Sequence, residues 1–150
     1  MTKKIDLATV QERVGGSYPA PFDQPCRERS RLRLGLAAGL SQFGVNLLRL
    51  PPNVWSSQRH WHSHEDEFIY VVQGEVVLVT SSGEEVLVAG DCAGFRAGDP
   101  DGHCLQNRTD RPALVLEVGT KTQGVDVVDY PDIDLRADSS GYSHKDGSRY

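Results

Sequence analysis

The chain has 150 residues, the size of one domain, and its 16 basic and 21 acidic side chains give a net charge of −5. This charge argues against nucleic-acid binding, which depends on neutralising phosphates with lysine and arginine. No apolar run approaches the roughly 20 residues that a membrane-spanning helix needs, and charges interrupt the apolar positions of the N-terminus. We therefore expect a cytoplasmic protein with neither nucleic-acid nor membrane partners.

The three cysteines, Cys26, Cys92 and Cys104, are an odd number, widely spaced and without a CxxC pair. This pattern indicates neither a disulfide framework nor a cysteine zinc site. We expect buried free thiols that pack as small apolar groups.

The first thirty residues mix charge, glycine and proline, with a short helical segment between Ile5 and Val14, and we expect them to form an arm on the outside of the domain. From Arg31 onward, short runs rich in β-branched or aromatic residues are bounded by turn-forming residues. Because no helical pattern separates these runs, they favour an all-β sandwich or barrel. The predicted strands are 31–36, 42–50, 68–73, 76–80, 85–88, 113–119 and 125–128.

The last residues, from about 130 onward, are polar and predict a surface tail. The whole chain, 1–150, is thus expected to be one domain with an arm (1–30), a β-barrel (31–129) and a tail (130–150).

A basic stripe precedes the first long strand, because Arg27, Arg29, Arg31 and Arg33 recur at every second residue and would line one face of a strand. We interpret it as the solvated outer face of an edge strand, where charge blocks unwanted pairing. The alternative is a surface that attracts an anionic ligand or a subunit.

A histidine cluster is the strongest chemical signal, since His60, His62 and His64 fall within the five-residue stretch HWHSH. In an extended strand alternate side chains share a face, so His60 and His62 point the same way and bring two imidazoles together. Two neutral imidazoles cannot satisfy each other's acceptors without a proton or a cation between them. The cluster therefore predicts a metal site.

Two further side chains can complete this site. Glu67 starts the next apolar run, where a turn returns its carboxylate to the histidine pair, and His103 comes from a distant segment after a glycine-rich turn. Three imidazoles and one carboxylate suit transition metals and suit calcium or magnesium poorly. With four protein ligands on an octahedral ion, two positions stay open for water, dioxygen or a chelating substrate.

The spacing of these residues resembles the two motifs of the cupin superfamily. The first motif, G-x5-H-x-H-x(3,4)-E-x6-G, is matched from His60 through His62 and Glu67 to Gly74. Its leading glycine falls on Val54, where the neighbouring Asn53 can serve the turn.

The second motif, G-x5-P-x-G-x2-H-x3-N, is matched more loosely by Gly90, Gly98, His103 and Asn107. Arg96 stands where the motif has proline, and two extra residues separate Gly98 from the histidine. Asn107 is expected to brace a turn through its side-chain amide.

The resemblance covers about half of the chain and implies a double-stranded β-helix, the cupin jelly roll, whose two antiparallel sheets enclose a pocket beside the metal. It implies that His60, His62, Glu67 and His103 hold one divalent transition metal ion (Zn, Fe, Mn or Ni). His64 has the same strand parity and is the alternative ligand, but pairing it with His62 leaves only two residues before Glu67, outside the family spacing. We place His64 at the pocket mouth or behind the ligands.

The expected function is an enzyme acting on a small polar metabolite through a mononuclear metal. Iron would allow dioxygenase chemistry, and Mn, Ni or Zn would allow isomerase or lyase chemistry by Lewis-acid catalysis. The alternative is a cupin that binds or senses a small molecule without turnover. No general base stands out beyond His64, Glu65 and Asp66. Other polar groups near the pocket-forming segments are Gln42, Asn46, Arg49, Arg96 and Gln106.

Strand alternation predicts that Ile69 and Val71 face the barrel interior, with Phe68 and Tyr70 on the other side of the strand. Together with the N-terminal arm and Trp61, these two aromatic residues offer an apolar surface for a two-fold partner. We therefore expect a homodimer.

Overall fold

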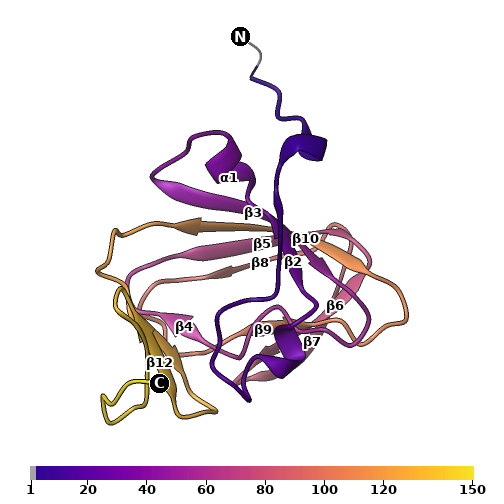
Figure 1. Ribbon diagram of the computed structural model, residues 1–150. Helices are drawn as coiled ribbons and strands as arrows, with labels where there is room; N and C mark the ends of the chain where they lie inside the picture. Colours follow the sequence, from indigo (N-terminus) through magenta and orange to yellow (C-terminus); the bar gives the residue numbers. More distant parts are fainter. Residues whose placement is uncertain (1–2) are drawn as a thin grey trace.

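The computed structural model describes residues 3–150, which form a layered arrangement of antiparallel sheets (Figure 1). The largest sheet has six strands in the order β1-β2-β3-β10-β5-β8. Its strands are β1 (Glu12–Val14), β2 (Ser30–Leu32), β3 (Phe43–Leu50), β10 (Ala113–Thr120), β5 (Glu67–Gln73) and β8 (Cys92–Phe95).

Two smaller sheets lie below this sheet in Figure 1. One is ordered β13-β12-β11-β4 and the other β7-β6-β9. Their strands are β4 (Trp61–His62), β6 (Glu75–Thr80), β7 (Gly83–Val88), β9 (Cys104–Gln106), β11 (Val128–Tyr130), β12 (Leu135–Asp138) and β13 (Gly141–Ser143). The predicted all-β jelly roll is confirmed, since within residues 3–150 every strand pair is antiparallel and helical structure is limited to α1 (Leu34–Ala37) and two 3-10 turns, Leu7–Thr9 and Gln24–Cys26.

The core lies between the sheets, and it follows from the alternation along β5. Ile69 and Val71 are buried as predicted, whereas Phe68, Tyr70 and Val72 point outward and are more than 40% exposed. A fully buried aliphatic side chain contributes about 1.5–3 kcal/mol through the hydrophobic effect. The cluster around Ile69 and Val71 contains Leu48, Leu50, Val54, Val76, Leu78, Leu105, Ala113 and Val115.

The chain before β3 differs from expectation in two places. The helix expected between Ile5 and Val14 is wrong, because only a 3-10 turn forms there and residues 12–14 pair with β2 instead. Pairing at a sheet edge supplies backbone hydrogen bonds that a short isolated helix could not keep in water. The strand expected over 31–36 ends at Leu32, because α1 begins at Leu34 and brings Gly35 against the backbone of β3.

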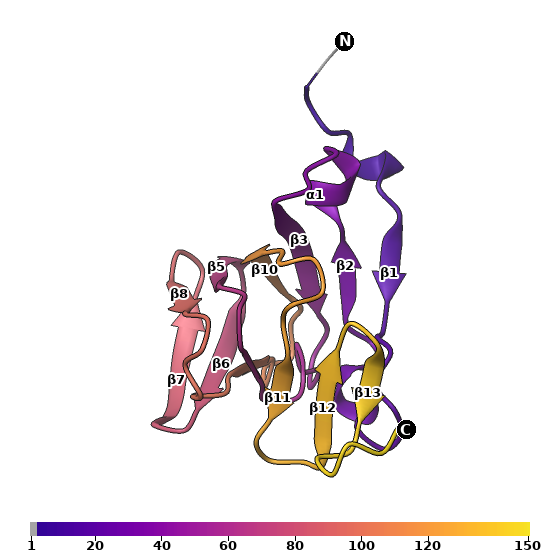
Figure 2. The same ribbon diagram turned by 90° about the vertical axis from the view of Figure 1, so that its left-hand side faces the viewer.

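The C-terminal segment also differs from the polar surface tail that we expected. Residues 135–138 and 141–143 form β12 and β13, which extend the sheet that contains β4 (Figure 2). Of the strand expected over 125–128, only Val128 belongs to β11. Their short length and polar surroundings concealed these strands, although β12 alternates the buried Leu135 and half-buried Ala137 with the exposed Arg136 and Asp138.

Asn107 braces a turn beside the core, as predicted. Its side chain is fully buried, its Nδ2 donates to the carbonyls of Leu50 and Arg111, and its Oδ1 accepts from the backbone and hydroxyl of Thr109. The prediction of buried free cysteines holds for two of the three. Cys26 and Cys104 are buried free thiols, whereas Cys92 is exposed on the edge strand β8.

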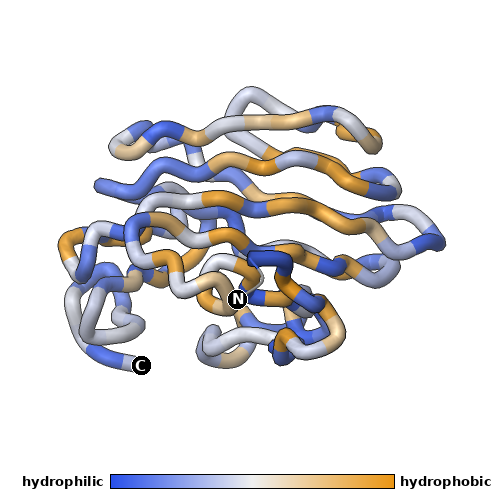
Figure 3. The backbone as a smooth tube through the Cα atoms, turned by 90° about the horizontal axis from the view of Figure 1, so that it is seen from above, coloured by the Kyte–Doolittle hydropathy of each residue, from blue (hydrophilic) through white to orange (hydrophobic). Residues whose placement is uncertain are grey.

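Among residues 3–150, no helix is both long and apolar enough to cross a membrane. Figure 3 shows that hydrophobic residues concentrate in the middle of the long strands and hydrophilic residues at their connections.

Candidate metal centre

Backbone pairing brings the two sequence-distant histidines together. His60 and His103 form an isolated antiparallel bridge in which each backbone N–H donates to the other residue's carbonyl, at 3.1 and 2.9 Å. Residues opposite each other in such a pair project their side chains to the same side of the sheet. The two imidazole rings accordingly lie with their centroids 4.8 Å apart.

Gly102, the residue before His103, allows the two backbone segments of this bridge to approach each other closely. A Cβ on Gly102 would lie 3.0 Å from a Pro131 ring carbon and 3.3 Å from the backbone nitrogen of His60, so only glycine fits without displacement. Arg59 secures the same loop, because it donates to the Gly102 carbonyl and pairs with Asp132 through two N–H groups at 2.8 Å.

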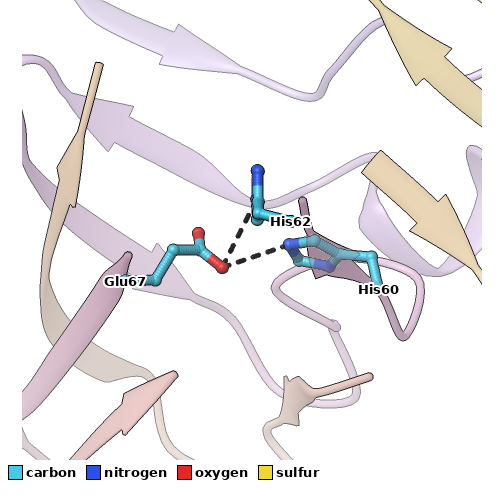
Figure 4. Close-up of side chains that lie close together, drawn as sticks. All are labelled: His60, His62 and Glu67. Atoms are coloured by element: carbon cyan, nitrogen blue, oxygen red, sulfur yellow. Dashed lines mark ion pairs between the residues drawn. The ribbon is translucent and has the colours of Figure 1, made fainter. Parts of the chain in front are cut away.

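His62 and Glu67 complete the cluster. His62 lies two residues beyond His60 on β4, and Glu67 is the first residue of β5. Figure 4 shows His60, His62 and Glu67 pointing toward one another. The Nε2 atoms of His103, His62 and His60 lie 2.9, 3.4 and 3.5 Å from a single oxygen, Glu67 Oε2.

These distances fit a metal ion. Ligand atoms about 2.1 Å from an ion and at right angles to one another lie about 3 Å apart, close to the spacing of the three nitrogens from Glu67 Oε2. That oxygen is buried and accepts no well-formed hydrogen bond within residues 3–150. A buried carboxylate oxygen without a partner is costly, and a cation would satisfy it.

The far sides of two imidazoles are held by acceptors. His60 Nδ1 lies 2.9 Å from the Gln58 carbonyl, and His62 Nδ1 lies 2.6 Å from Asp126 Oδ2. Each Nδ1–H therefore donates outward and leaves the Nε2 lone pair directed into the cluster, the tautomer that a metal ligand needs. His103 is positioned differently, since its ring stacks on Phe95 with centroids 3.5 Å apart.

The cluster shifts the pKa values of its members in opposite directions. Burial alone would raise the pKa of Glu67, but the three imidazoles close to its carboxylate hold that pKa well below its usual range. Burial would lower the pKa of His62, but Glu67 and Asp126 outweigh this effect and raise it to about 9. Glu67 therefore stays ionised at neutral pH, and a metal ion would displace the proton that His62 otherwise holds.

Asp126 was missed in the sequence analysis. Besides holding His62, it accepts from the backbone N–H of His64 through Oδ1 at 2.8 Å and from Ser63 Oγ at 3.3 Å. Glu65 stands 4.0 Å from the same His62 nitrogen. No spacing rule connects Asp126 to the histidine motif, because it arrives from the loop before β11.

The other residues singled out from the sequence are distributed around this cluster. His64 is exposed and its Nδ1 pairs with Ser63 Oγ at 2.8 Å, away from Glu67. Asn53, beside the missing glycine of the first motif, has the positive φ of 63° that the turn requires. Gly74 also has a positive φ, and a Cβ there would lie 2.9 Å from the Pro112 carbonyl oxygen.

Two cavities open onto the cluster and share Glu65, Glu67, Phe95 and His103. The first cavity, of about 370 Å³, extends between β3, β10 and the N-terminal segment and is lined by Arg29, Arg31, Asn46 and Lys121 among others. The second cavity, of about 360 Å³, lies on the side of Trp61. Arg96 lines the second cavity, whereas Gln42, Arg49 and Gln106 line neither.

The two cavities differ in charge. Three cations line the first cavity, and they balance its three carboxylates, Glu65, Glu67 and Glu117, before any metal charge is added. The second cavity has one cation, Arg96, against five carboxylates: Glu65, Glu67, Glu85, Asp99 and Asp101. An anionic small molecule is therefore accommodated far better in the first cavity.

The interpretation of the arginine stripe as a solvated outer face is wrong for its central members. Arg29 is only 8% exposed, and Arg31 is half-buried and pairs with Glu117 through two N–H groups at 2.7 and 2.9 Å. Because Arg31 is opposite the buried Leu48 in the β2–β3 register, it faces inward. The alternative, a basic surface that meets an anion, fits these positions better.

Comparison with known proteins agrees with this fold. The cupin domain family model matches residues 46–119. A sugar phosphate isomerase of the cupin superfamily from Silicibacter pomeroyi DSS-3 is 49% identical, with a TM-score of 0.92 over 98% of this chain and 96% of that one. This chain belongs to the cupin superfamily.

Other cupin similarities are more distant. A candidate sugar phosphate isomerase from Acidithiobacillus ferrooxidans is 28% identical, with a TM-score of 0.71 over 77% of this chain and 74% of that one. The polyketide cyclase RemF from Streptomyces resistomycificus, at 19% identity and a TM-score of 0.64 over 80% of each chain, shares the fold alone. None of the curated proteins matches the sequence.

Replacing Asp126 with asparagine should weaken divalent metal binding by about 10–100-fold, because His62 loses the charged acceptor that orients its ring. The dissociation constant would be measured by competition with a chromogenic chelator. Asp129→Asn, a similar change on β11, is the control. Equal affinity in wild type and Asp126→Asn would show that Asp126 does not support the site.

Proposed function

We propose that this cupin is a metal-dependent isomerase of a small phosphorylated sugar. The observation that carries the proposal is the convergence of three imidazole nitrogens on Glu67 Oε2, which has no hydrogen-bond partner among residues 3–150, beside a cavity lined by the buried Arg29 and the half-buried Arg31. The 49% identity to the Silicibacter protein over nearly the whole chain supports the same reaction class.

His60, His62, Glu67 and His103 would hold one divalent transition metal ion of the group Zn, Fe, Mn or Ni. Nitrogen ligands with one carboxylate suit these ions. When bound, such an ion polarises a carbonyl group and the neighbouring hydroxyl as a Lewis acid. The chain itself excludes water from one side of the cluster, where the Phe95 ring covers His103.

An aldose–ketose isomerisation needs no external oxidant or reductant. One hydrogen leaves C2 and one is added to C1, while one leaves the C2 hydroxyl and one is added to the C1 carbonyl oxygen. The protein must therefore supply a group that carries a proton between adjacent carbons.

Glu65 is the best-placed proton carrier. It lines both cavities, and its Oε1 is fixed by the backbone N–H and hydroxyl of Thr122 at 2.9 and 3.0 Å. Its Oε2 lies 4.0 Å from His62 Nδ1, on the side of the ring that faces Asp126. The other cavity carboxylate, Glu117, is committed to Arg31.

Protein purified without added metal should contain close to one transition metal ion per chain and should interconvert an aldose phosphate and its ketose phosphate. His62→Ala should lose both the metal and the turnover, whereas His64→Ala should keep the metal. Elemental analysis and a coupled isomerase assay over a panel of sugar phosphates measure these outcomes. Metal retained in His62→Ala would remove the site. Oxygen consumption would indicate a dioxygenase, and binding without product would indicate a sensing protein.

Glu65→Gln should lower kcat by about 10²–10⁴-fold, the usual contribution of a general base. KM and metal content should stay close to wild type, because glutamine keeps the shape of the side chain. Asp66→Asn is the matched control, since the neighbouring Asp66 lines neither cavity. A fall in metal content parallel to the fall in kcat would show that Glu65 supports the metal instead.

We also propose that the chain forms a homodimer through the outer face of the six-stranded sheet. Tyr70 is directly opposite Leu116 on β10, and Leu116 is opposite Leu47 on β3, so apolar side chains continue across three strands. Tyr70 and Val72 are 42% and 48% exposed on this face. Trp61, which we expected on the dimer surface, instead lines the second cavity.

Light scattering coupled to size exclusion should report a dimer for wild type and a monomer for Tyr70→Glu. A charge buried against a second copy is unfavourable unless it is paired. Val86→Glu, an exposed position on β7, should stay dimeric. A monomeric wild type, or a dimer that survives Tyr70→Glu, would contradict this interface.

A further inference from the structure

A smaller cavity of about 200 Å³ adjoins the first cavity at the sheet edge formed by β1, β2 and β3, which lie side by side in Figure 2. The two cavities share Arg29, Arg31 and Asn46. No acidic residue lines the smaller one. Its lining is Arg13, Gly15, Gly16, Ser17, Arg29, Arg31, Arg33 and Asn46.

Arg29 is a buried cation that has no acidic partner among residues 3–150. Its guanidinium donates to the carbonyls of Ser56 and Gly15 and lies over the Tyr18 ring, 5.3 Å from the centroid. A Cβ on Gly16 would lie 2.3 Å from Arg29 Nη2, so glycine is required there for the guanidinium to keep its place. Carbonyl groups satisfy hydrogen bonds but leave the net charge uncompensated, which is costly in a buried position.

The strand pairing adds like charge to this buried cation. Arg13 on β1 is directly opposite Arg31 on β2, so both side chains lie on the same face of the sheet. Like charges that face each other across strands are destabilising. Glu12 cannot relieve this repulsion, because it lies on the opposite face and accepts from Ser30 Oγ at 2.5 Å.

Two exposed arginines, Arg13 and Arg33, also line this smaller cavity. Arg33 makes no ion pair with any described residue, and neither does Arg13; both line the open side of the small cavity. Arg31 alone is neutralised, by Glu117. Three uncompensated guanidinium groups thus surround a space of about 200 Å³.

We infer that this arginine cavity binds the phosphate group of the substrate, while the sugar extends through the first cavity to the histidine cluster. The inference rests on the proposed function and specifies which residues recognise the phosphate. A phosphate dianion offers several acceptor oxygens and matches the forked N–H donors of arginine. It would compensate Arg29 and remove the repulsion between Arg13 and Arg31. Asn46, at the junction of the two cavities, is placed to donate to the bridging oxygen or to a sugar hydroxyl.

Titration with inorganic phosphate tests the cavity without any turnover. Isothermal titration calorimetry would compare wild type with the double variant Arg13→Gln/Arg33→Gln, which alters only exposed side chains. The matched control is Arg49→Gln/Arg111→Gln, because it removes the same charge from exposed positions that line none of these cavities. Metal content is verified to be equal in all three proteins.

The cavity double variant should bind phosphate at least tenfold more weakly than wild type, and the control double variant less than twofold more weakly. An equal loss in both double variants would assign the effect to overall charge and overturn the inference. Unchanged affinity in the cavity double variant would overturn it as well.

Kinetics distinguish failure of this inference from failure of the proposed function. With an active enzyme, the cavity double variant should raise KM for a sugar phosphate at least tenfold and leave KM for the same sugar without phosphate unchanged. Turnover with no such difference would refute the phosphate site alone. Phosphate binding that depends on Arg13 and Arg33, without turnover of any sugar phosphate, would refute the isomerase and retain the anion site.

Discussion

The reciprocal backbone pairing of His60 and His103 is the constraint on which the site depends. It joins segments 43 positions apart in the chain, and it fixes the direction of both imidazoles before any ligand binds. Gly102 allows the close approach, and Arg59 ties the same loop to the C-terminal strands. Glu67 begins β5 of the six-stranded sheet, whereas His62 lies on β4 of the four-stranded sheet. The cluster therefore forms only when these two sheets pack correctly against each other.

The charged side chains are distributed unevenly between the two cavities, although the net charge of the chain is −5. Acidic side chains dominate the cavity beside Trp61, whereas the buried Arg29 and the half-buried Arg31 line the first cavity. A protein with an overall negative charge would repel a sugar phosphate at long range, but screening limits that repulsion to about 8–10 Å at physiological salt. At shorter range the local arginines, together with the metal ion that we propose, would decide where an anion binds.

The sequence allowed the fold class and the four clustered side chains to be predicted, because the fold class depends on local periodicity and the cluster on the spacing within two motifs. The strand alternation of β5 correctly placed Ile69 and Val71 in the core. The strands β12 and β13 could not be predicted, since they are short, lie in a polar segment and depend on pairing, β12 with β11 and β13 with β12. Asp126 and the inward direction of Arg31 escaped prediction for a related reason: each depends on a contact between residues distant in sequence.

The N-terminal segment contributes side chains to the walls of two cavities. It was expected to cover the outside of the barrel, yet Arg13 and Tyr18 both reach the cavity walls. Tyr18 packs against Tyr130 and Tyr142 with centroids 5.7 and 5.8 Å apart, so the segment is anchored to the C-terminal sheet as well as to β2. Aromatic contacts of this kind contribute about 0.5–1.5 kcal/mol each beyond the burial of their area. The jelly roll supplies the histidine cluster, and the anchored N-terminal segment supplies the walls that give the larger cavity its positive end.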